Sequence, residues 1–264
     1  MNSLEKVIPF LLLLNSCQTF KPSNDLSVYD LYPPKNLEVK YQVEWQQKFY
    51  NDRIVDFRKK PIGFKKIVFL GNSITQGAKS WNKRFNLRNL VNRGISGDIT
   101  EGVLSRLNEI YYYKPLGVFL LIGINDIFNA DSSNWDDINP NYVAKNILKI
   151  AKNINNNSKY TQVYIQTILP VDLGKYKEVK GFNNHVSKTD LNIQIKEINS
   201  ILKNSTNLDP SIKILDINKS FIDDNGLLIS NLSHDGIHLN EDGYNVWTEE
   251  LKPYITELNK VLSN

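Results

Sequence analysis

The chain has 264 residues, of which 41% are hydrophobic and 23% charged, enough to bury the core of one ordinary α/β domain. Its net charge of +4 comes from basic residues mixed with acidic ones rather than gathered in a stripe, which argues against nucleic acid as a partner. One cysteine excludes an internal disulfide, and the three histidines lack metal-ligand spacing, so neither a metal nor a cofactor is expected.

The N-terminus carries a short apolar run at residues 7–14, preceded by one lysine. This run is too short to span a bilayer and has the size of a signal-peptide core. The segment Leu-Asn-Ser-Cys that follows is similar to a bacterial lipobox ending at Cys17. Residues 1–17 therefore predict a signal peptide with Cys17 as the lipidation site, hence an exported bacterial lipoprotein that meets the membrane only through this anchor. The alternative is a frayed helix with a buried free cysteine.

Residues 18–40, with three prolines, predict a tether, and residues 41–63 a helical extension whose helix covers 41–60. Strand and helix patterns then alternate through a catalytic domain at 64–262. Strands are predicted at 66–70, 89–92, 117–122, 162–167 and 213–217, and helices at 81–87, 100–112, 140–155, 189–203 and 241–262. Residues 170–184 are polar and predict a loop. Such alternation indicates a parallel sheet with helices on both faces.

Three polar segments follow successive predicted strands. Ser73 lies in Gly-Asn-Ser-Ile-Thr after the first, Gly97 in Asn-Arg-Gly-Ile-Ser-Gly-Asp after the second, and Asn125 in Gly-Ile-Asn-Asp after the third. Taken singly, each is as consistent with a helix cap or a turn as with catalysis. Together they fall at the carboxyl edge of a parallel sheet, where doubly wound folds place their ligand sites.

A fourth segment, Asp235-Gly-Ile-His238, precedes the last helix. Histidine is suited to accepting a proton at neutral pH, and an aspartate three positions earlier on the same loop is able to hold its other ring nitrogen. Asn240 is suited to cap the helix, so Asp235 is not needed as its N-cap. The segments therefore supply a nucleophile, a base, an orienting group and oxyanion donors, which predicts acyl transfer.

These segments resemble the four blocks of the SGNH (GDSL-like) hydrolases, in the same order along the chain. The resemblance implies a triad of Ser73, His238 and Asp235, and an oxyanion hole made by the backbone N–H groups of Ser73 and Gly97 and the Asn125 amide. It also implies a flavodoxin-like three-layer α/β/α fold with a five-stranded parallel sheet and no cofactor.

One position departs from the family pattern, since Asn72 stands where block one usually has aspartate. Residues 92–100 resemble the branch of the platelet-activating-factor acetylhydrolase subunits, and they are similar to bacterial sialate-type and other carbohydrate O-acetylesterases. The expected substrate is therefore a small-molecule or glycan ester with a small acyl group. A lysophospholipase or thioesterase is the alternative enzyme, and a non-catalytic glycan-binding surface lipoprotein is the alternative outside catalysis. The sequence does not decide the oligomeric state.

Overall fold

A computed structural model describes residues 28–260 except 134, 182–189 and 207. The predicted signal peptide, Cys17 and the first part of the predicted tether lie outside the described residues. Within the described part of the chain, no helix is both long and apolar enough to cross a membrane.

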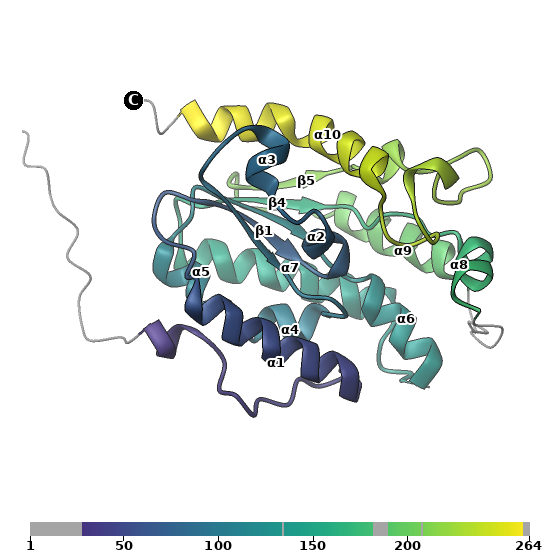
Figure 1. The fold of residues 1–264 in the computed structure, drawn as a ribbon, viewed down its shortest axis with the longest axis horizontal. Coiled ribbons are helices and arrows are strands. Elements are labelled where there is room, and N and C mark those ends of the chain that lie inside the picture. Colours follow the sequence, from purple (N-terminus) through teal and green to yellow (C-terminus); the bar gives the residue numbers. More distant parts are fainter. Residues whose placement is uncertain (1–27, 134, 182–189, 207, 261–264) are drawn as a thin grey trace, which may run out of the picture.

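The chain folds into five parallel strands in the order β2-β1-β3-β4-β5, with helices on both sides (Figure 1). The strands are β1 (Ile67–Gly71), β2 (Leu90–Gly94), β3 (Gly117–Leu121), β4 (Gln162–Gln166) and β5 (Ile212–Leu215). The helices are α1 (Glu44–Lys59), α2 (Ser73–Gly77), α3 (Trp81–Phe85), α4 (Thr100–Leu104), α5 (Asn108–Tyr113), α6 (Ile124–Ser133), α7 (Pro140–Asn157), α8 (Leu173–Lys180), α9 (Leu191–Lys203) and α10 (Glu241–Lys260). The predicted α/β class and five-stranded parallel sheet are confirmed.

The sheet is buried on both faces, which explains why its central strands read as continuous apolar runs. All five residues of β1 and of β3 are buried. Figure 1 shows α3 and α10 over one face, and α1, α4, α5 and α7 over the other. Chain order reverses between β1 and β3, so the segments after these strands flank the point where such sheets bind ligands.

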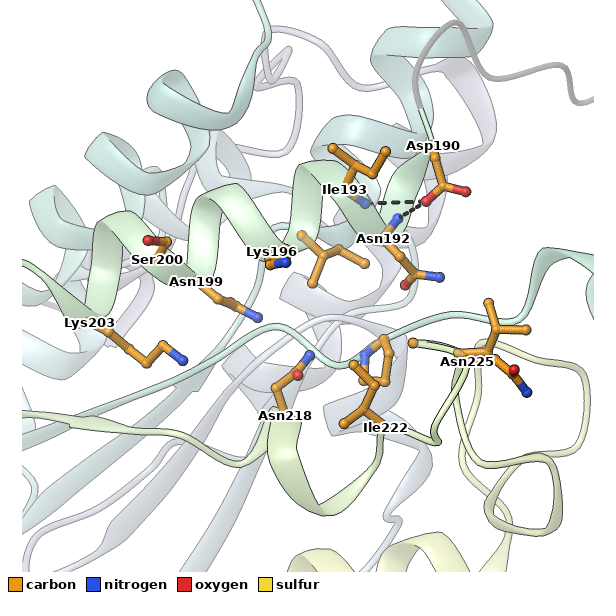
Figure 2. Close-up of a pocket in the computed structure, with 14 residues that line it drawn as sticks. Asp190, Asn192, Ile193, Lys196, Asn199, Ser200, Lys203, Asn218, Ile222 and Asn225 are labelled. Atoms are coloured by element: carbon orange, nitrogen blue, oxygen red, sulfur yellow. Dashed lines mark hydrogen bonds between the residues drawn. The ribbon is translucent and has the colours of Figure 1, made fainter.

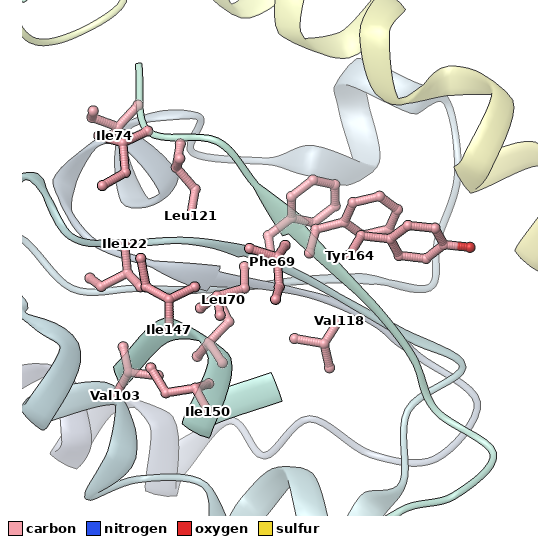
Figure 3. Close-up of a cluster of buried hydrophobic side chains, with 14 of the residues drawn as sticks. Phe69, Leu70, Ile74, Val103, Val118, Leu121, Ile122, Ile147, Ile150 and Tyr164 are labelled. Atoms are coloured by element: carbon pink, nitrogen blue, oxygen red, sulfur yellow. The ribbon is translucent and has the colours of Figure 1, made fainter. Parts of the chain in front are cut away.

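A row of stacked rings crosses the sheet beneath α10 (Figure 3). Phe69, Phe119 and Tyr164 are register partners on β1, β3 and β4, with centroid separations of 5.3 Å and 4.5 Å. Trp81 of α3 stacks on Phe69 at 3.8 Å, and Trp247 of α10 meets Trp81 edge-on at 5.0 Å. Since aromatic pairs add to simple area burial, this row joins three strands and two helices into one core.

The tether predicted at 18–40 is wrong over its described part, because residues 28–40 pack on the domain. Tyr32 is buried, and its hydroxyl donates to the carbonyl oxygen of Phe57 at 3.0 Å and to the Glu109 carboxylate at 2.5 Å. Glu109 is also held by Arg93 of β2, with two nitrogen–oxygen distances of 2.9 Å. A buried carboxylate needs such partners, so this segment completes a polar core site and does not hang free.

Two further expectations were wrong. The loop predicted at 170–184 contains α8, which Asp172 caps by accepting the Lys175 N–H at 3.0 Å. The helix predicted at 100–112 is divided into α4 and α5 by a turn at residues 105–107. That turn carries Arg106, whose side chain is buried.

Candidate active site

Ser73 is the first residue of α2, directly after β1. A side chain on Gly71 would come within 2.2 Å of the Leu121 carbonyl oxygen, so a glycine allows the end of β1 to lie this close to β3. Asn72 is the N-cap of α2, since its side-chain oxygen accepts the Ile74 N–H at 3.0 Å. Ser73 is therefore not needed as the cap, and its half-buried hydroxyl is left for chemistry.

His238 links Ser73 to Asp235. Its Nε2 lies 3.0 Å from the Ser73 Oγ, and its Nδ1 lies 2.9 Å from the Asp235 Oδ2. The other carboxylate oxygen, Oδ1, accepts the backbone N–H of Ile237 at 3.1 Å and of His238 at 2.8 Å. With Nδ1 turned to a carboxylate, Nε2 faces the hydroxyl as a general base requires.

The Asp235 carboxyl is held in its ionised form. Burial by itself would raise its pKa, but hydrogen bonds from the His238 ring and from the backbone N–H groups of His238 and Ile237 outweigh burial and hold the pKa well below its usual range. An ionised carboxylate at Nδ1 stabilises the imidazolium that forms when the ring accepts a proton.

The helix α8, which sequence reasoning missed, clamps the Asp235–His238 loop. The Asp172 N–H donates to the Gly236 carbonyl oxygen at 2.7 Å, and the Lys180 Nζ lies 3.4 Å from the Asp235 Oδ2. Gly236 has φ +84°, and a Cβ there would come within 2.1 Å of the Asp172 carbonyl oxygen. Lys180 belongs to no recognisable motif, so only the fold reveals its place beside Asp235.

The loop at residues 94–98, here called the oxyanion loop, packs against α2 and α6. The Ser96 N–H donates to the Gln76 Oε1 at 2.7 Å, and the Asn125 Nδ2 donates to the Asp98 carbonyl oxygen at 2.9 Å. Gly97 has φ +78°, a backbone conformation that favours glycine. The structure thus brings the predicted oxyanion residues to neighbouring loops, while their donor roles stay predictions.

A buried arginine joins the loops on either side of Ser73. Arg106 binds the Asp98 carboxylate through Nε at 3.0 Å and Nη2 at 2.8 Å. Its guanidinium also donates to the carbonyl oxygens of Arg93 at 2.9 Å and Gly71 at 3.2 Å. Removing one partner from such a buried pair is strongly destabilising, so Arg106 is a structural support that no sequence motif indicated.

Asp126, next to Asn125, is a second buried carboxyl beneath the site. It accepts the Thr100 N–H at 3.1 Å and the Thr100 hydroxyl at 2.5 Å. Burial raises the pKa of Asp126 to about 7, and the hydrogen bonds from Thr100 offset only part of the lost hydration. This carboxyl fastens α6 to the start of α4.

The described residues contain no group of three or more His, Cys, Asp or Glu side chains that could hold a metal ion. His234 is exposed on the loop beside His238, and its side chain takes no part in the relay. His185 and Cys17 lie outside the described residues.

A cavity of about 680 Å³ opens elsewhere, between α9 and the segment at 218–227 (Figure 2). Its lining includes no triad or predicted oxyanion residue. The amides of Asn192 and Asn199 on its wall are bonded to the backbone of Val171 and Ile168. These asparagines therefore hold the segment after β4 in place.

Comparison with known proteins places all four polar segments within the part of the chain that one family model matches. The model of the GDSL-like Lipase/Acylhydrolase family matches residues 69–246, more than half of the chain. The platelet-activating factor acetylhydrolase IB subunit alpha2 of Rattus norvegicus is 25% identical over 197 residues, which cover 73% of this chain and 76% of that protein.

Two solved structures share the fold. A GDSL-like lipase from Bacteroides thetaiotaomicron superposes with a TM-score of 0.60 at 20% identity, covering 79% of this chain and 97% of that chain. The acetyl xylan esterase AlAXEase superposes with a TM-score of 0.53 at 18% identity, covering 72% and 99%. At these identities the likeness is one of architecture.

Proposed function

This chain belongs to the GDSL-like lipase/acylhydrolase family of carboxylic ester hydrolases, and on that premise we propose that it is an O-acetylesterase acting on acetylated carbohydrate through Ser73, His238 and Asp235. The observation that carries the proposal is the continuous relay from Ser73 Oγ to His238 Nε2 at 3.0 Å and from His238 Nδ1 to Asp235 Oδ2 at 2.9 Å.

In the first half-reaction, His238 Nε2 takes the proton of the Ser73 hydroxyl as Oγ attacks the ester carbonyl carbon. The negative charge on the carbonyl oxygen is held by the N–H groups of Ser73 and Gly97 and by the Asn125 amide. The tetrahedral intermediate collapses when His238 gives its proton to the departing alcohol oxygen. Water, deprotonated by His238, then attacks the acetyl-enzyme and releases acetate and free Ser73.

Support for the acetyl group comes from the names of relatives. The curated relative is named an acetylhydrolase, and one structure of the same fold is an acetyl xylan esterase. Another, from Talaromyces cellulolyticus, is named a carbohydrate esterase of family 3 and has a TM-score of 0.53 at 16% identity. These names favour removal of acetyl groups from carbohydrate over cleavage of long acyl chains.

The decisive experiment is an acyl-length series on p-nitrophenyl esters, run beside acetate release from acetylated xylo-oligosaccharides and O-acetylated sialic acid. We expect kcat/KM to peak at acetate or propionate, because an acyl chain that does not fit displaces the carbonyl from its attack position. Each methylene that a groove buried would add about 0.8 kcal/mol, so a groove enzyme would show rising values instead. A steady rise to octanoate would indicate the lysophospholipase or thioesterase alternative. A Ser73→Ala variant is the control for both assays.

Export as a lipoprotein is proposed on the sequence alone. Residues 7–17 carry the apolar run and the lipobox-like segment that ends at Cys17. Metabolic labelling with palmitate in a bacterial host is expected to mark the wild-type chain and not Cys17→Ser. Equal labelling of both chains, or of neither, would refute lipidation at Cys17.

A further inference from the structure

Two aromatic side chains are exposed one helical turn apart on α1. Trp45 is 52% exposed and Phe49 is 49% exposed, and their rings meet edge-to-face with centroids 6.0 Å apart. Large apolar side chains exposed next to one another on a folded protein point to a binding surface. Both side chains keep about half of their surface in solvent, so the described elements leave this part of α1 open to a ligand.

Trp45 lies directly against the oxyanion loop. A Cβ added to Gly97 would come within 2.7 Å of the Trp45 Cη2 and 2.8 Å of its Cζ3. The absence of a side chain at Gly97 is therefore what allows the indole to lie this close to a predicted oxyanion donor. Trp45, the first residue of the exposed pair, therefore lies at the edge of the candidate active site.

The helix is fixed in this place by polar contacts on either side of Trp45. The Gln42 Nε2 donates to the Asp98 Oδ1 at 3.2 Å, and the Tyr50 hydroxyl donates to the Gly102 carbonyl oxygen at 3.0 Å. The ring pair is thus held in a set position relative to the site, and a ligand that uses it does not have to order the helix first.

We propose that Trp45 and Phe49 form a stacking platform for a neighbouring sugar ring of a carbohydrate substrate whose acetylated ring is bound at Ser73. This proposal rests on the proposed function, and it assigns a binding site to the sugar ring that neighbours the acetylated ring. A pyranose presents an apolar face of C–H groups and a rim of hydroxyls. The indole offers a flat, rigid surface with a negative face, which attracts polarised C–H groups at a small cost in conformational entropy.

The surroundings favour a sugar over a lipid. A half-exposed ring pair covers only one side of a ligand, which is sufficient for a sugar ring that stacks on it. An acyl chain, in contrast, obtains its full free energy of burial only when its methylenes are enclosed on all sides. Exposed Glu44, Lys48 and Asp52 flank the pair on the same helix. Two acidic groups beside the rings disfavour both entry into hydrocarbon and contact with an anionic bilayer.

The first test compares two substrates in each variant. For Trp45→Ala, Phe49→Ala and the double variant, kcat/KM is measured on acetylated xylo-oligosaccharides and on p-nitrophenyl acetate, which has no second sugar ring. The ratio of the two values is expected to fall about tenfold in the double variant, mainly through KM, which corresponds to about 1.4 kcal/mol of binding. The ratio corrects for any disturbance of the oxyanion loop. Phe49→Ala serves as the variant whose side chain is not among the nearest neighbours of Gly97.

The matched control is Phe64→Ala. Phe64 is 58% exposed and packs edge-on against Tyr113 at 5.1 Å, but it precedes β1 and so lies at the opposite end of the sheet from Ser73. This variant is expected to leave both activities unchanged. An unchanged ratio in the double variant would overturn the proposal. So would loss of binding to phosphatidylcholine–phosphatidylglycerol vesicles in the double variant with the ratio intact, which would assign the pair to a membrane.

The second test is independent of turnover. Trp45 is the exposed member of the chain's four tryptophans, since Trp81 and Trp247 are buried and Trp135 is partly buried. Unacetylated xylo-oligosaccharide is expected to protect the fluorescence of the Ser73→Ala variant from acrylamide quenching, and Trp45→Phe is expected to abolish that effect. If wild type releases no acetate from any carbohydrate, the proposed substrate fails. If the oligosaccharide gives no protection in Ser73→Ala, the platform fails whatever the acetate assay shows.

Discussion

Replacing Asn125 with alanine tests the predicted oxyanion hole, because the structure separates the two tasks of this side chain. Its amide has two N–H bonds. One donates to the Asp98 carbonyl oxygen at 2.9 Å, and the second is the predicted donor to the oxyanion. Asn125→Ala removes both donors, and each loss has its own measurable consequence.

The two losses are expected to differ in their effect on catalysis and on stability. Loss of an oxyanion donor raises the barrier by about 3–4 kcal/mol, a hundred- to thousandfold fall in kcat. Loss of the bond to Asp98 at a half-buried position lowers the free energy of unfolding by about 0.5–1.5 kcal/mol. Because the Asp98 carbonyl follows Gly97 in the oxyanion loop, a loosened loop also weakens the second donor, which places the fall in kcat toward the upper end.

The assay combines steady-state kinetics on p-nitrophenyl acetate with urea unfolding. For Asn125→Ala we expect kcat to fall at least a hundredfold with KM changed by less than about threefold, since the donor acts mainly on the transition state. Asn199→Ala is the control: its amide bonds the Ile168 N–H at 2.8 Å and carbonyl oxygen at 2.9 Å, on the wall of the separate cavity. It is expected to lose stability and keep its kcat. A rise in KM at constant kcat for Asn125→Ala would refute the reasoning and make Asn125 a ground-state binding group.

Four further predictions concern the same site. A fluorophosphonate probe is expected to label Ser73 alone, and peptide mass spectrometry showing another labelled serine would move the nucleophile. EDTA is expected to leave activity unchanged, because the relay supplies its own base; inactivation reversed by a divalent ion would contradict this. Gly236→Ala combines a φ of +84° with a Cβ 2.1 Å from the Asp172 carbonyl oxygen, so it should lower both the urea midpoint and kcat/KM, and unchanged values would refute the clamp on the Asp235–His238 loop. Burial raises the pKa of Asp126 to about 7, above its unfolded value. Its stabilising contribution is therefore fully present below the unfolded pKa and is lost as the pH rises from there to about 7, which amounts to about 3 kcal/mol between pH 5 and 8. Asp126→Asn should lack this loss in urea unfolding at the two pH values, and an equal pH dependence in both proteins would show that Asp126 titrates normally.

The sequence by itself determined the sheet and the order of the polar segments, because both are local signals. Buried parallel strands read as short apolar runs, and each predicted strand lies within about two residues of an observed one at its ends. Ser73, Gly97 and Asn125 were located because each follows a strand directly. The Asp235–His238 spacing predicted contact between those two side chains, and they lie 2.9 Å apart.

The tertiary structure decided everything that depends on contacts between distant segments. The helix α8 has no fully buried side chain, and only Leu173 and Tyr176 pack partly against the core, so its apolar pattern is too weak to predict a helix. Its cap at Asp172 and its contacts with the Asp235–His238 loop are seen only in the fold. The same holds for residues 28–40, which complete the site around Glu109, for Arg106, which joins two loops, and for Trp45, which reaches Gly97 across 52 positions of sequence. Periodicity reports which face of an element is buried, but it carries no information on which distant residue lies against that face.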